Sequence, residues 1–395
     1  MRILRKASFK SVLLPVMAAV AVAACGGGNS ESTVAVLPIP VVSVDLVADA
    51  SKSVATSIGA TVIAGASSDE EVFNMAADIG DSWQLILNNK TGTYTIKVLI
   101  SQYGLTSTTA ASFTKTTSGA IVTIKDATGK ALLVQIDTRT RTAGGRVLLG
   151  GKVATVAGTG YVVNDTTKLA GNYSYLGATR NASNGIFRDN PIGSLIVAAN
   201  GTDVTVCDQG IVVNGACAAI PGSGIPVVPG RLLKLSKDAA TGLIRIKVDA
   251  RDFGALHVSA GDRGPVLILD RFGFNDENVL RTGVILAAKS AKLAGMEFNG
   301  NFICSTLGTD TGDIVVANTS FSVKDLVSNT NNTGTLLYNK AVSSIGVALD
   351  LDGVAIAQFK NETLAQASLV LPLSSSLAVA AALGDGTLDI CRRAS

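Results

Sequence analysis

Two stretches of the chain alternate apolar and polar residues on either side of a polar turn that contains glycine. They are "SWQLILNNKTGTYTIKVLISQYG" (82–104) and "RLLKLSKDAATGLIRIKVDARDFG" (231–254). Alternation with a period of two gives a strand one buried face, and a short glycine-containing turn between two such runs is typical of a β-hairpin. The pattern therefore predicts two related hairpins, about 150 residues apart.

Further motifs follow each hairpin in the same order. In the second copy, "PVLILD" at 265 corresponds to "ALLVQID" at 131 of the first, and "TGVILAAK" at 282 corresponds to "GRVLLGGK" at 145. "KLAG" occurs at 168 and again at 292, and "SLAVAAALGDGTLDIC" at 376 corresponds to "SLIVAANGTDVTVC" at 194. Each copy carries roughly eight strand-like runs, which suits an antiparallel barrel or sandwich. The period of about 150 residues does not favour a short-period solenoid, because such arrays repeat every 20 to 50 residues or so.

The repeat and the turn-rich segments predict the domain organisation. We expect an all-β fold of two tandem antiparallel β-barrel or β-sandwich modules, residues 44–217 and 231–395, joined by a Pro/Gly linker at 218–230. The second module is expected to fold alone. The alternative is a swapped closure, in which strands from 82–167 complete a barrel with strands after 292.

One short N-terminal helix is predicted near residues 69–79, in "SSDEEVFNMAADIG". Ser68 and Glu71 have the spacing of a capping box, acidic residues crowd the first turn, and Gly80 stands where a helix would end.

The first 24 residues combine Arg2, Arg5, Lys6 and Lys10 with a short apolar run, and contain no acidic residue. The run is too short to span a bilayer, which takes about 20 apolar residues, so residues 1–24 read as a signal peptide. "VAAC", ending at Cys25, resembles the lipobox of bacterial (Gram-negative) outer-membrane lipoproteins. That resemblance implies cleavage before Cys25, palmitate-type acylation there, and, with Gly26 following, outer-membrane localisation facing the periplasm or the cell surface. Residues 25–43 then form a glycine-rich, lipidated tether.

Removal of residues 1–24 changes the charge of the chain. Of the 33 Lys and Arg residues four lie there, which leaves 29 against 30 Asp and Glu residues. The mature chain is near neutral, so nothing supports a nucleic-acid surface, and no nucleic-acid partner is expected.

Four cysteines remain after Cys25, an even number in an oxidising compartment. Aligning the copies places Cys304 where the first copy has Tyr175, and Cys391 where it has Cys207. We therefore expect disulfides between Cys304 and Cys391 and between Cys207 and Cys217. No CxxC spacing occurs, and no metal or cofactor site is predicted.

Candidate catalytic residues are few. His257 is the single histidine and alternates with apolar residues on an expected strand, so we expect a packed histidine rather than a base. Ser112 and Lys115 fit SxxK but lie in a β-patterned region. The sequence does not place Glu297 and Asp313 at glycosidase spacing, and Asp350, Asp352 and Gly353 suit a turn better than a calcium loop. No catalytic residue is therefore assigned.

Gly171 and Tyr173, which open a strand after a short lead-in, resemble the glycine and aromatic residue that open lipocalin-type barrels, although the motif would fall within the first module. The body of the chain also resembles, loosely, surface lipoproteins built from paired β-barrel lobes. We expect a non-enzymatic, envelope-tethered binding or structural module, held to the membrane by its anchor, with a protein, glycan or apolar small molecule as partner. The alternative is an envelope hydrolase acting on polysaccharide or peptide.

Overall fold

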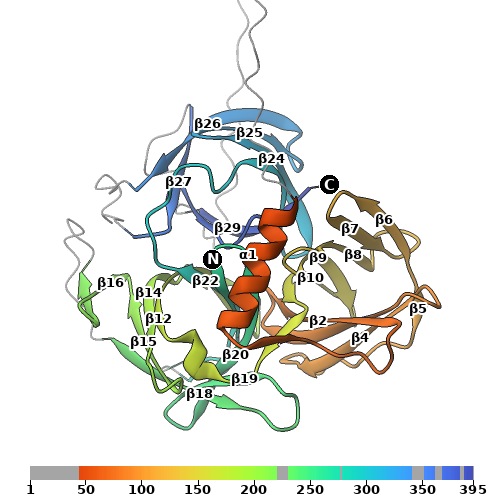
Figure 1. Ribbon diagram of the computed structural model, residues 1–395, viewed down its shortest axis with the longest axis horizontal. Helices are drawn as coiled ribbons and strands as arrows, with labels where there is room; N and C mark the ends of the chain where they lie inside the picture. The colour runs from red at the N-terminus through yellow and green to blue at the C-terminus, as the bar shows by residue number, and fades with distance from the viewer. Residues whose placement is uncertain are drawn as a thin grey trace, which may run out of the picture. The chain divides into compact units, whose positions relative to one another are not determined.

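The computed structural model describes residues 44–219, 230–275, 278–339, 351–360, 367–382 and 387–394. Antiparallel strands dominate these residues and form three large sheets, each a meander that curls toward closure (Figure 1). We call them the first, middle and last barrels, in chain order. An α-helix, α1 (Val44–Ser57), precedes them.

The first barrel is closed by pairing of its first and last long strands and is open only between two consecutive short strands, β5 and β6. Its strands are β2 (Glu70–Ala77), β3 (Asp81–Asn88), β4 (Thr93–Ile100), β5 (Ala111–Ser112), β6 (Thr114–Ser118), β7 (Ile121–Lys125), β8 (Leu132–Asp137), β9 (Thr142–Leu149) and β10 (Lys152–Thr159). A small sheet of β1 (Ala60–Val62) and β11 (Tyr161–Val163) lies beside it.

The middle barrel closes where its first strand pairs with its last. Its strands are β12 (Gly171–Asn181), β14 (Ile192–Val197), β15 (Asp203–Asp208), β18 (Arg231–Lys237), β19 (Ile244–Val248), β20 (Arg251–Gly261), β21 (Gly264–Arg271) and β22 (Arg281–Lys289), with β13 (Phe187–Asp189) paired to the end of β12 and a hairpin of β16 (Gly210–Val213) and β17 (Ala216–Ala219) beside β15. A 3-10 turn, η1 (Thr166–Leu169), leads into β12.

The last barrel is also a closed eight-stranded meander. Its strands are β23 (Gly300–Thr306), β24 (Thr309–Ala317), β25 (Ser320–Asp325), β26 (Thr330–Tyr338), β27 (Ala355–Phe359), β28 (Ser368–Pro372), β29 (Leu377–Ala382) and β30 (Leu388–Arg393). Its closing pair is β23 and β30.

The middle and last barrels open and close with the same arrangement of residues. Each first strand begins with Gly-Asn-aromatic, and the aromatic residue is paired with a cation near the end of the last strand: Tyr173 with Lys289, and Phe302 with Arg393. Lys289 Nζ lies 4.4 Å from the centre of the Tyr173 ring and donates to the carbonyl of Ala170, just before the opening glycine. Arg393 repeats both contacts, over Phe302 and with the carbonyl of Asn299. We call this repeated arrangement the latch.

A large apolar core lies between the barrels rather than inside them. It joins the outward faces of β12, β21 and β22 to those of β28, β29 and β30, with Ala76 and Ala157 added from the first barrel. Strands buried on both faces need continuous apolar runs, which explains sequences such as "GVILAA" at 283–288, all of whose residues are buried.

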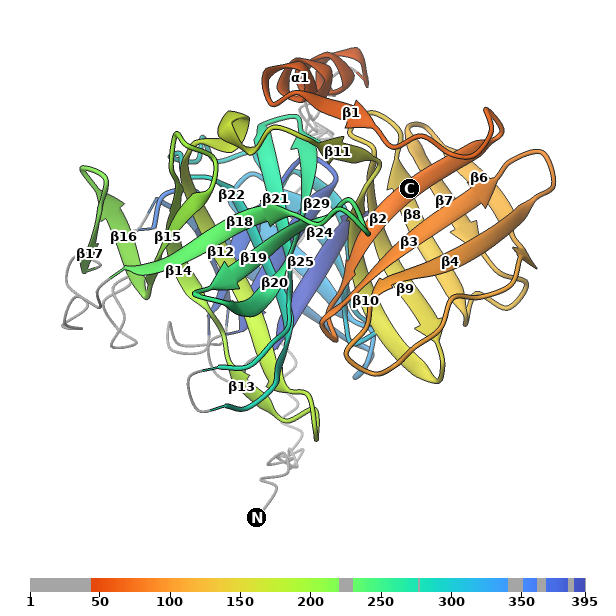
Figure 2. The same ribbon diagram turned by 90° about the horizontal axis from the view of Figure 1, so that it is seen from below.

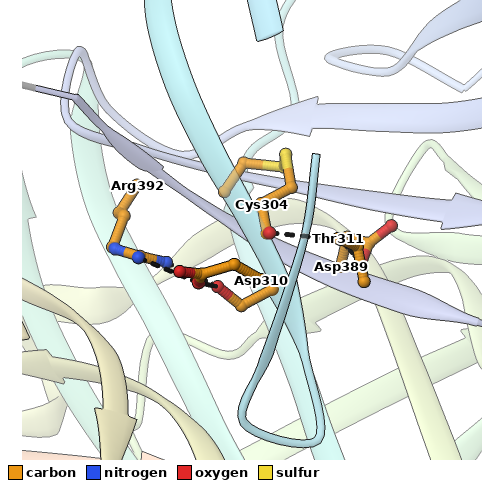
Figure 3. The surroundings of a disulfide bond; sticks show 7 residues. Cys304, Asp310, Thr311, Asp389 and Arg392 are labelled. Atoms are coloured by element: carbon orange, nitrogen blue, oxygen red, sulfur yellow. Dashed lines mark hydrogen bonds and ion pairs between the residues drawn. A yellow bond between two sulfur atoms is a disulfide. The ribbon is translucent and has the colours of Figure 1, made fainter. Parts of the chain in front are cut away.

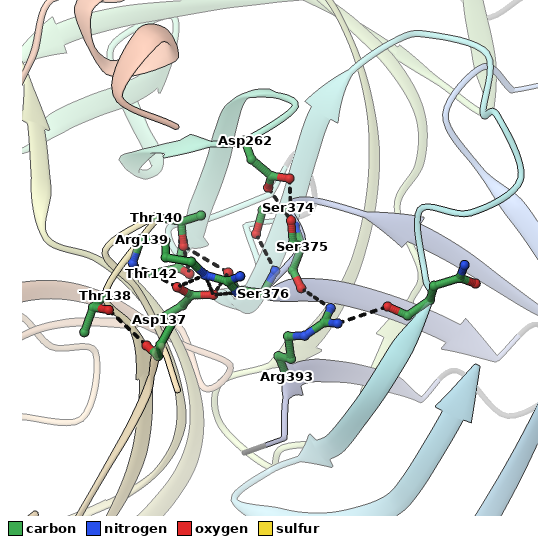
Figure 4. A network of polar contacts seen from close by, with 12 residues as sticks. Asp137, Thr138, Arg139, Thr140, Thr142, Asp262, Ser374, Ser375, Ser376 and Arg393 are labelled. Carbon is green, nitrogen blue, oxygen red and sulfur yellow. Dashed lines mark hydrogen bonds and ion pairs between the residues drawn. The ribbon is translucent and has the colours of Figure 1, made fainter. Parts of the chain in front are cut away.

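Polar contacts also connect the three barrels. The loop between β28 and β29 carries Ser375 and Ser376 (Figure 4). The Ser376 hydroxyl donates to Asp137 of the first barrel at 2.7 Å, and the Ser375 N–H donates to Asp262 of the middle barrel at 2.7 Å. On another side, Asp78 of the first barrel accepts from the backbone N–H of Leu307 in the last barrel at 2.6 Å.

The predicted module boundary at 218–230 is not a boundary between barrels. β15, before this segment, pairs with β18, after it, and both belong to the middle barrel. A fragment of residues 231–395 would lack β12, β14 and β15 and would leave that barrel open, so the strand pairing gives no support to the expectation that it folds alone. The swapped closure is not observed either, because the strands of 82–159 pair only among themselves and with β2 in the described part of the chain.

The helix predicted near 69–79 is also wrong, since Glu70–Ala77 is the strand β2. Phe73, Met75 and Ala77 point into the first barrel with a period of two, and that burial outweighs the local capping signal. The helix lies at Val44–Ser57 instead, with Val47, Ser51 and Ala55 buried along one face.

Other expectations are confirmed. The fold is all-β with antiparallel barrels in tandem and one α-helix in the described residues. Both predicted hairpins form, as β3–β4 and β18–β19, and the turn glycines Gly92 and Gly242 have φ of +65° and +73°. Both predicted cysteine pairs are present, Cys207 with Cys217 and Cys304 with Cys391.

Candidate functional site: two barrel cavities

The interiors of the three barrels differ. The first barrel is filled by large side chains, among them Trp83, Phe73 and Met75, each at most 1% exposed. The middle barrel encloses a cavity of about 370 Å³ and the last barrel one of about 410 Å³. Volumes of this size match small-molecule sites, which span roughly 300–1,000 Å³.

The middle cavity has an apolar wall formed by inward-facing residues of the barrel strands. The aliphatic residues of this wall are Leu195, Val197, Val204, Val206, Leu233, Leu235, Ile246, Leu256, Leu267, Leu269, Ile285 and Ala287. Tyr175 and Phe253 are the aromatic residues that also line this cavity.

One end of the middle barrel is plugged. Ala55 and Ile58, at the end of α1, pack in one apolar cluster with Leu169 of η1 and Tyr173 of β12. Ser51 of the helix donates to the carbonyl of Ala260 at 2.6 Å, which fixes the helix over this end. In Figure 2, α1 lies above the barrel and β13 lies at the opposite end.

Charged residues gather at the end away from α1, which we call the charged rim. Its members among the cavity-lining residues are Arg188, Asp189, Asp208, Arg231, Arg271 and Arg281. Arg271 is 5% exposed. Its Nη1 donates to the carbonyl of Phe253 at 3.0 Å and to that of Phe272, and its guanidinium lies 4.0 Å from the centre of the Phe253 ring.

Burial and neighbouring charges shift the pKa values of rim residues. Burial, helped by repulsion from Arg231 and Arg281, lowers the pKa of Arg271 to about 10. Burial and the nearby Asp189 raise the pKa of Asp208. Arg271 nonetheless stays protonated at neutral pH, so the rim presents a buried positive charge to the cavity.

The last cavity is lined by aromatic and small residues, including Phe302, Phe321, Phe359, Ala378 and Ala380. Its polar lining includes Asp325, Asn332 and Asp389, and none of the described residues that line it is basic. The Thr311 hydroxyl lies 2.7 Å from Asp389 Oδ1 and 3.1 Å from the carbonyl of Cys304. The Cys304–Cys391 disulfide faces this cavity and links the two strands that close the barrel (Figure 3).

His257 lies in a fully buried polar cluster between the first and middle barrels, away from both cavities. Its Nε2 is 3.0 Å from Ser82 Oγ, and that hydroxyl donates to Asp270 Oδ2 at 2.6 Å. In a catalytic triad the acid orients the histidine, but here Asp270 accepts from the serine, and His257 Nδ1 has no hydrogen-bond partner. Burial lowers the pKa of His257 to about 4 and raises that of Asp270 well above its usual value. The cluster is therefore uncharged, and it connects the first barrel to the middle barrel rather than forming a catalytic triad.

The other residues singled out in the sequence are dispersed. Ser112 and Lys115 are exposed on β5 and β6. Glu297 accepts backbone N–H groups from Ala294, Gly295 and Met296, a turn contact rather than a catalytic one. Asp352 forms an ion pair with Lys292 at 3.3 Å. Cys25, the tether and Asp350 lie outside the described residues.

The charged rim was missed at the sequence level, although a signal for it exists. In an antiparallel meander, the starts of alternate strands and the ends of the strands between them meet at one rim. Arg231 and Arg281 start β18 and β22, Arg271 ends β21, and Asp208 ends β15. The sequence alone does not show that these strands belong to one closed barrel, and without that knowledge the four residues could not be grouped.

The described residues hold no group of three or more His, Cys, Asp or Glu side chains placed to bind a metal ion. Among the same residues, no helix combines the length and the apolar character that crossing a bilayer requires.

Comparisons with known proteins give little. No family model matches the chain, and no curated protein matches it. Among solved structures, a protein of unknown function from the DUF3598 family of Nostoc punctiforme is similar at 10% identity, over 82% of this chain and 94% of that one, with a TM-score of 0.14. A likeness at that TM-score carries no argument about fold or function.

Proposed function

We propose that this protein is a non-enzymatic binding protein that holds apolar small molecules inside its middle and last barrels. The observation that carries the proposal is the pair of mainly apolar cavities inside two barrels, beside a first barrel of related architecture that is filled. Binding sites for small molecules combine apolar walls with a few placed polar groups. Both cavities have this composition.

The first barrel serves as a scaffold in this proposal. Its interior is packed, and its outward face contributes to the joints with the other two barrels through Ser82 and Asp137. A rigid support keeps the cavity walls in place, so that an apolar ligand need not itself order the barrel before it binds.

The proposal includes an envelope location. Acylation at Cys25 would hold the barrels to the outer membrane through the tether of residues 25–43, close to a source of apolar ligands. Replacing Cys25 with serine should release the protein from the membrane fraction. An acyl-free N-terminal peptide from the wild-type protein would contradict this part of the proposal.

Ligand binding is tested by titrating the full chain carrying Cys25→Ser with Nile red, a neutral fluorescent probe. The serine variant needs no detergent, which would compete for the cavities. Ala287 lines the middle cavity and Ala380 the last, so Ala287→Trp and Ala380→Trp should each remove about one of two binding sites. Ala111→Trp, at an exposed position of β5, is the matched control.

Each variant is first checked for an unchanged circular dichroism spectrum and cooperative unfolding. Two saturable sites that fall to one in each single variant, and to none in the double variant, support the proposal. Absence of saturable binding, or binding that the double variant leaves unchanged, would overturn it.

A further inference from the structure

The charged rim contains a buried cation whose contacts leave its charge unpaired. The hydrogen bonds of Arg271 go to the carbonyls of Phe253, Phe272 and Gly273. These carbonyls and the Phe253 ring fix the orientation of the guanidinium but carry no net charge. A buried charge without an opposite charge is costly, and a bound anion would offset that cost.

Charges of both signs surround Arg271: Arg231 and Arg281 repel it, whereas Asp189 and Asp270 attract it. Four arginines and two aspartates line the cavity. The aspartates are in part satisfied by neutral hydroxyls: the Thr179 hydroxyl donates to Asp189, and the Tyr175 hydroxyl lies 3.4 Å from Asp208 Oδ1. Burial is the main cause of the lowered pKa of Arg271, and repulsion from Arg231 and Arg281 adds to it. Arg271, whose hydrogen bonds go to backbone carbonyls and not to a carboxylate, is therefore the rim residue that favours an anion.

The remaining wall of the cavity excludes a small hydrophilic anion as the natural occupant. From the rim inward the cavity is lined by leucine, valine, isoleucine and alanine side chains, as far as the cluster that α1 covers. Water or a hydrated ion would find no hydrogen-bond partner along that wall. A ligand that fills the cavity needs an apolar body and one charged end.

We infer that the middle barrel binds an amphipathic monoanion, a long-chain alkyl carboxylate, with its chain among the aliphatic wall residues and its carboxylate at Arg271, flanked by Arg231 and Arg281. This inference rests on the proposed function and names the ligand class of one of its two sites. A carboxylate fits the planar, two-pronged donor geometry of a guanidinium. The last cavity, with Asp325 and Asp389 and no basic lining residue among those described, does not fit the same ligand.

The test compares tetradecanoate with its methyl ester by isothermal titration calorimetry, on the full Cys25→Ser chain carrying Ala380→Trp so that only the middle cavity is available. The acid should bind at least tenfold more tightly than the ester. The preference should shrink at least fivefold in Arg271→Gln and weaken as salt concentration rises. Lys234→Gln, on the exposed face of β18, removes a positive charge outside the cavity and should leave the preference unchanged.

Arg271→Gln is accepted only if its unfolding transition and its Nile red binding match those of the parent protein. Arg231→Gln is the second variant, since its side chain is not buried to the same degree. Equal binding of acid and ester, or a preference that survives both substitutions, would overturn the inference while leaving the proposed function intact. If neither compound binds and Nile red does not bind either, the proposed function itself fails. Tighter binding of tetradecyl phosphate than of tetradecanoate would overturn the carboxylate assignment.

Discussion

The middle and last barrels share their framework and differ in what lines their cavities. Both are eight-stranded meanders closed between the first and last strands, and both carry the latch in the same register. Position by position, Tyr175 corresponds to Cys304 and Ala287 to Cys391. The middle barrel closes with a tyrosine facing an alanine and carries arginines at its rim. The last barrel closes with a disulfide and carries aspartates.

The comparison separates the residues that close a barrel from those that line its cavity. The latch residues lie at the ends of paired strands and contact one another, so their contacts require the observed register of the closing strands. The charged residues that line the two cavities differ: the middle cavity has four arginines and two aspartates, and the described lining of the last cavity has two aspartates and no basic residue. In the proposed function, two barrels of one framework would in this way take ligands of different charge.

The largest expected effect comes from the closing disulfide of the last barrel. Cys304 and Cys391 are 87 residues apart, and the loop-entropy relation gives a stabilisation of about 4.5 kcal/mol for a loop of that length. The Cys304→Ala/Cys391→Ala protein should lose about that much free energy of unfolding in urea, and should lose the Nile red site of the last cavity.

The matched control is the other disulfide. Cys207 and Cys217 are 10 residues apart, which predicts about 2.7 kcal/mol. Since this bridge does not join the closing strands, the Cys207→Ala/Cys217→Ala protein should keep the last-cavity site. Equal losses of stability in the two double variants would contradict the idea that the Cys304–Cys391 disulfide stabilises the pairing of β23 with β30.

A second prediction compares the joints that hold the first barrel to the other two. His257, at the joint with the middle barrel, has its pKa lowered by burial from 6.5 to about 4. The unfolded chain therefore binds more protons than the native protein between these values, and stability falls as the pH drops from 6.5 toward 4. The difference in free energy of unfolding between wild type and His257→Asn should accordingly rise by about 3 kcal/mol from pH 4 to pH 7.

Asp78, at the joint with the last barrel, should show the opposite slope. Burial raises its pKa from 3.8 to about 6, against the lowering effect of hydrogen bonds from Leu307 and Thr155. The native protein holds this proton longer than the unfolded chain, so stability falls as the pH rises from 3.8 to about 6. The difference between wild type and Asp78→Asn should fall by about 3 kcal/mol over that range. Slopes of the same sign in the two variants would contradict this assignment.

The smallest of the three effects concerns the latch. Gly171 and Gly300 have φ of +134° and +131°, a region that costs a residue with a side chain about 1–3 kcal/mol. A Cβ at either position would lie 2.4 Å from the cation of the last strand, Lys289 Nζ or Arg393 Nη2. Gly171→Ala and Gly300→Ala should each destabilise the protein by that amount in urea titrations. If only one of the two substitutions lowered the free energy of unfolding, the two latches would not be equivalent.

Part of this architecture was predictable from the sequence because it depends on residues that are close together in the chain. The hairpins at 82–104 and 231–254 follow from alternation and turn glycines, and aligning Cys304 with Tyr175 matches the register in the structure. Aligning Cys391 with Cys207 does not match the register, because the residue of the middle barrel that corresponds to Cys391 is Ala287. The cysteine pairs were nonetheless the right ones, because cross-strand pairing brings Cys304 and Cys391 together.

The remainder depends on pairing between strands far apart in the chain. A Pro/Gly-rich segment such as 218–230 has the composition of a domain linker, yet it connects two neighbouring strands of one barrel. The capping box at Ser68 is a weak local preference, which the burial of Phe73 and Met75 overrides. The rim arginines stand at strand ends that come together only on closure, so the sequence pattern alone did not group them.

The central claim, that the middle barrel holds an apolar ligand while the first barrel does not, is tested most directly by a crystal structure of the Cys25→Ser chain soaked with 14-bromotetradecanoate. The account predicts anomalous bromine density inside the middle barrel, near the cluster of Tyr173 and Leu169, with the carboxylate at Arg271 and no bromine in the first barrel. Side chains filling the middle barrel, or bromine only on the protein surface, would contradict it.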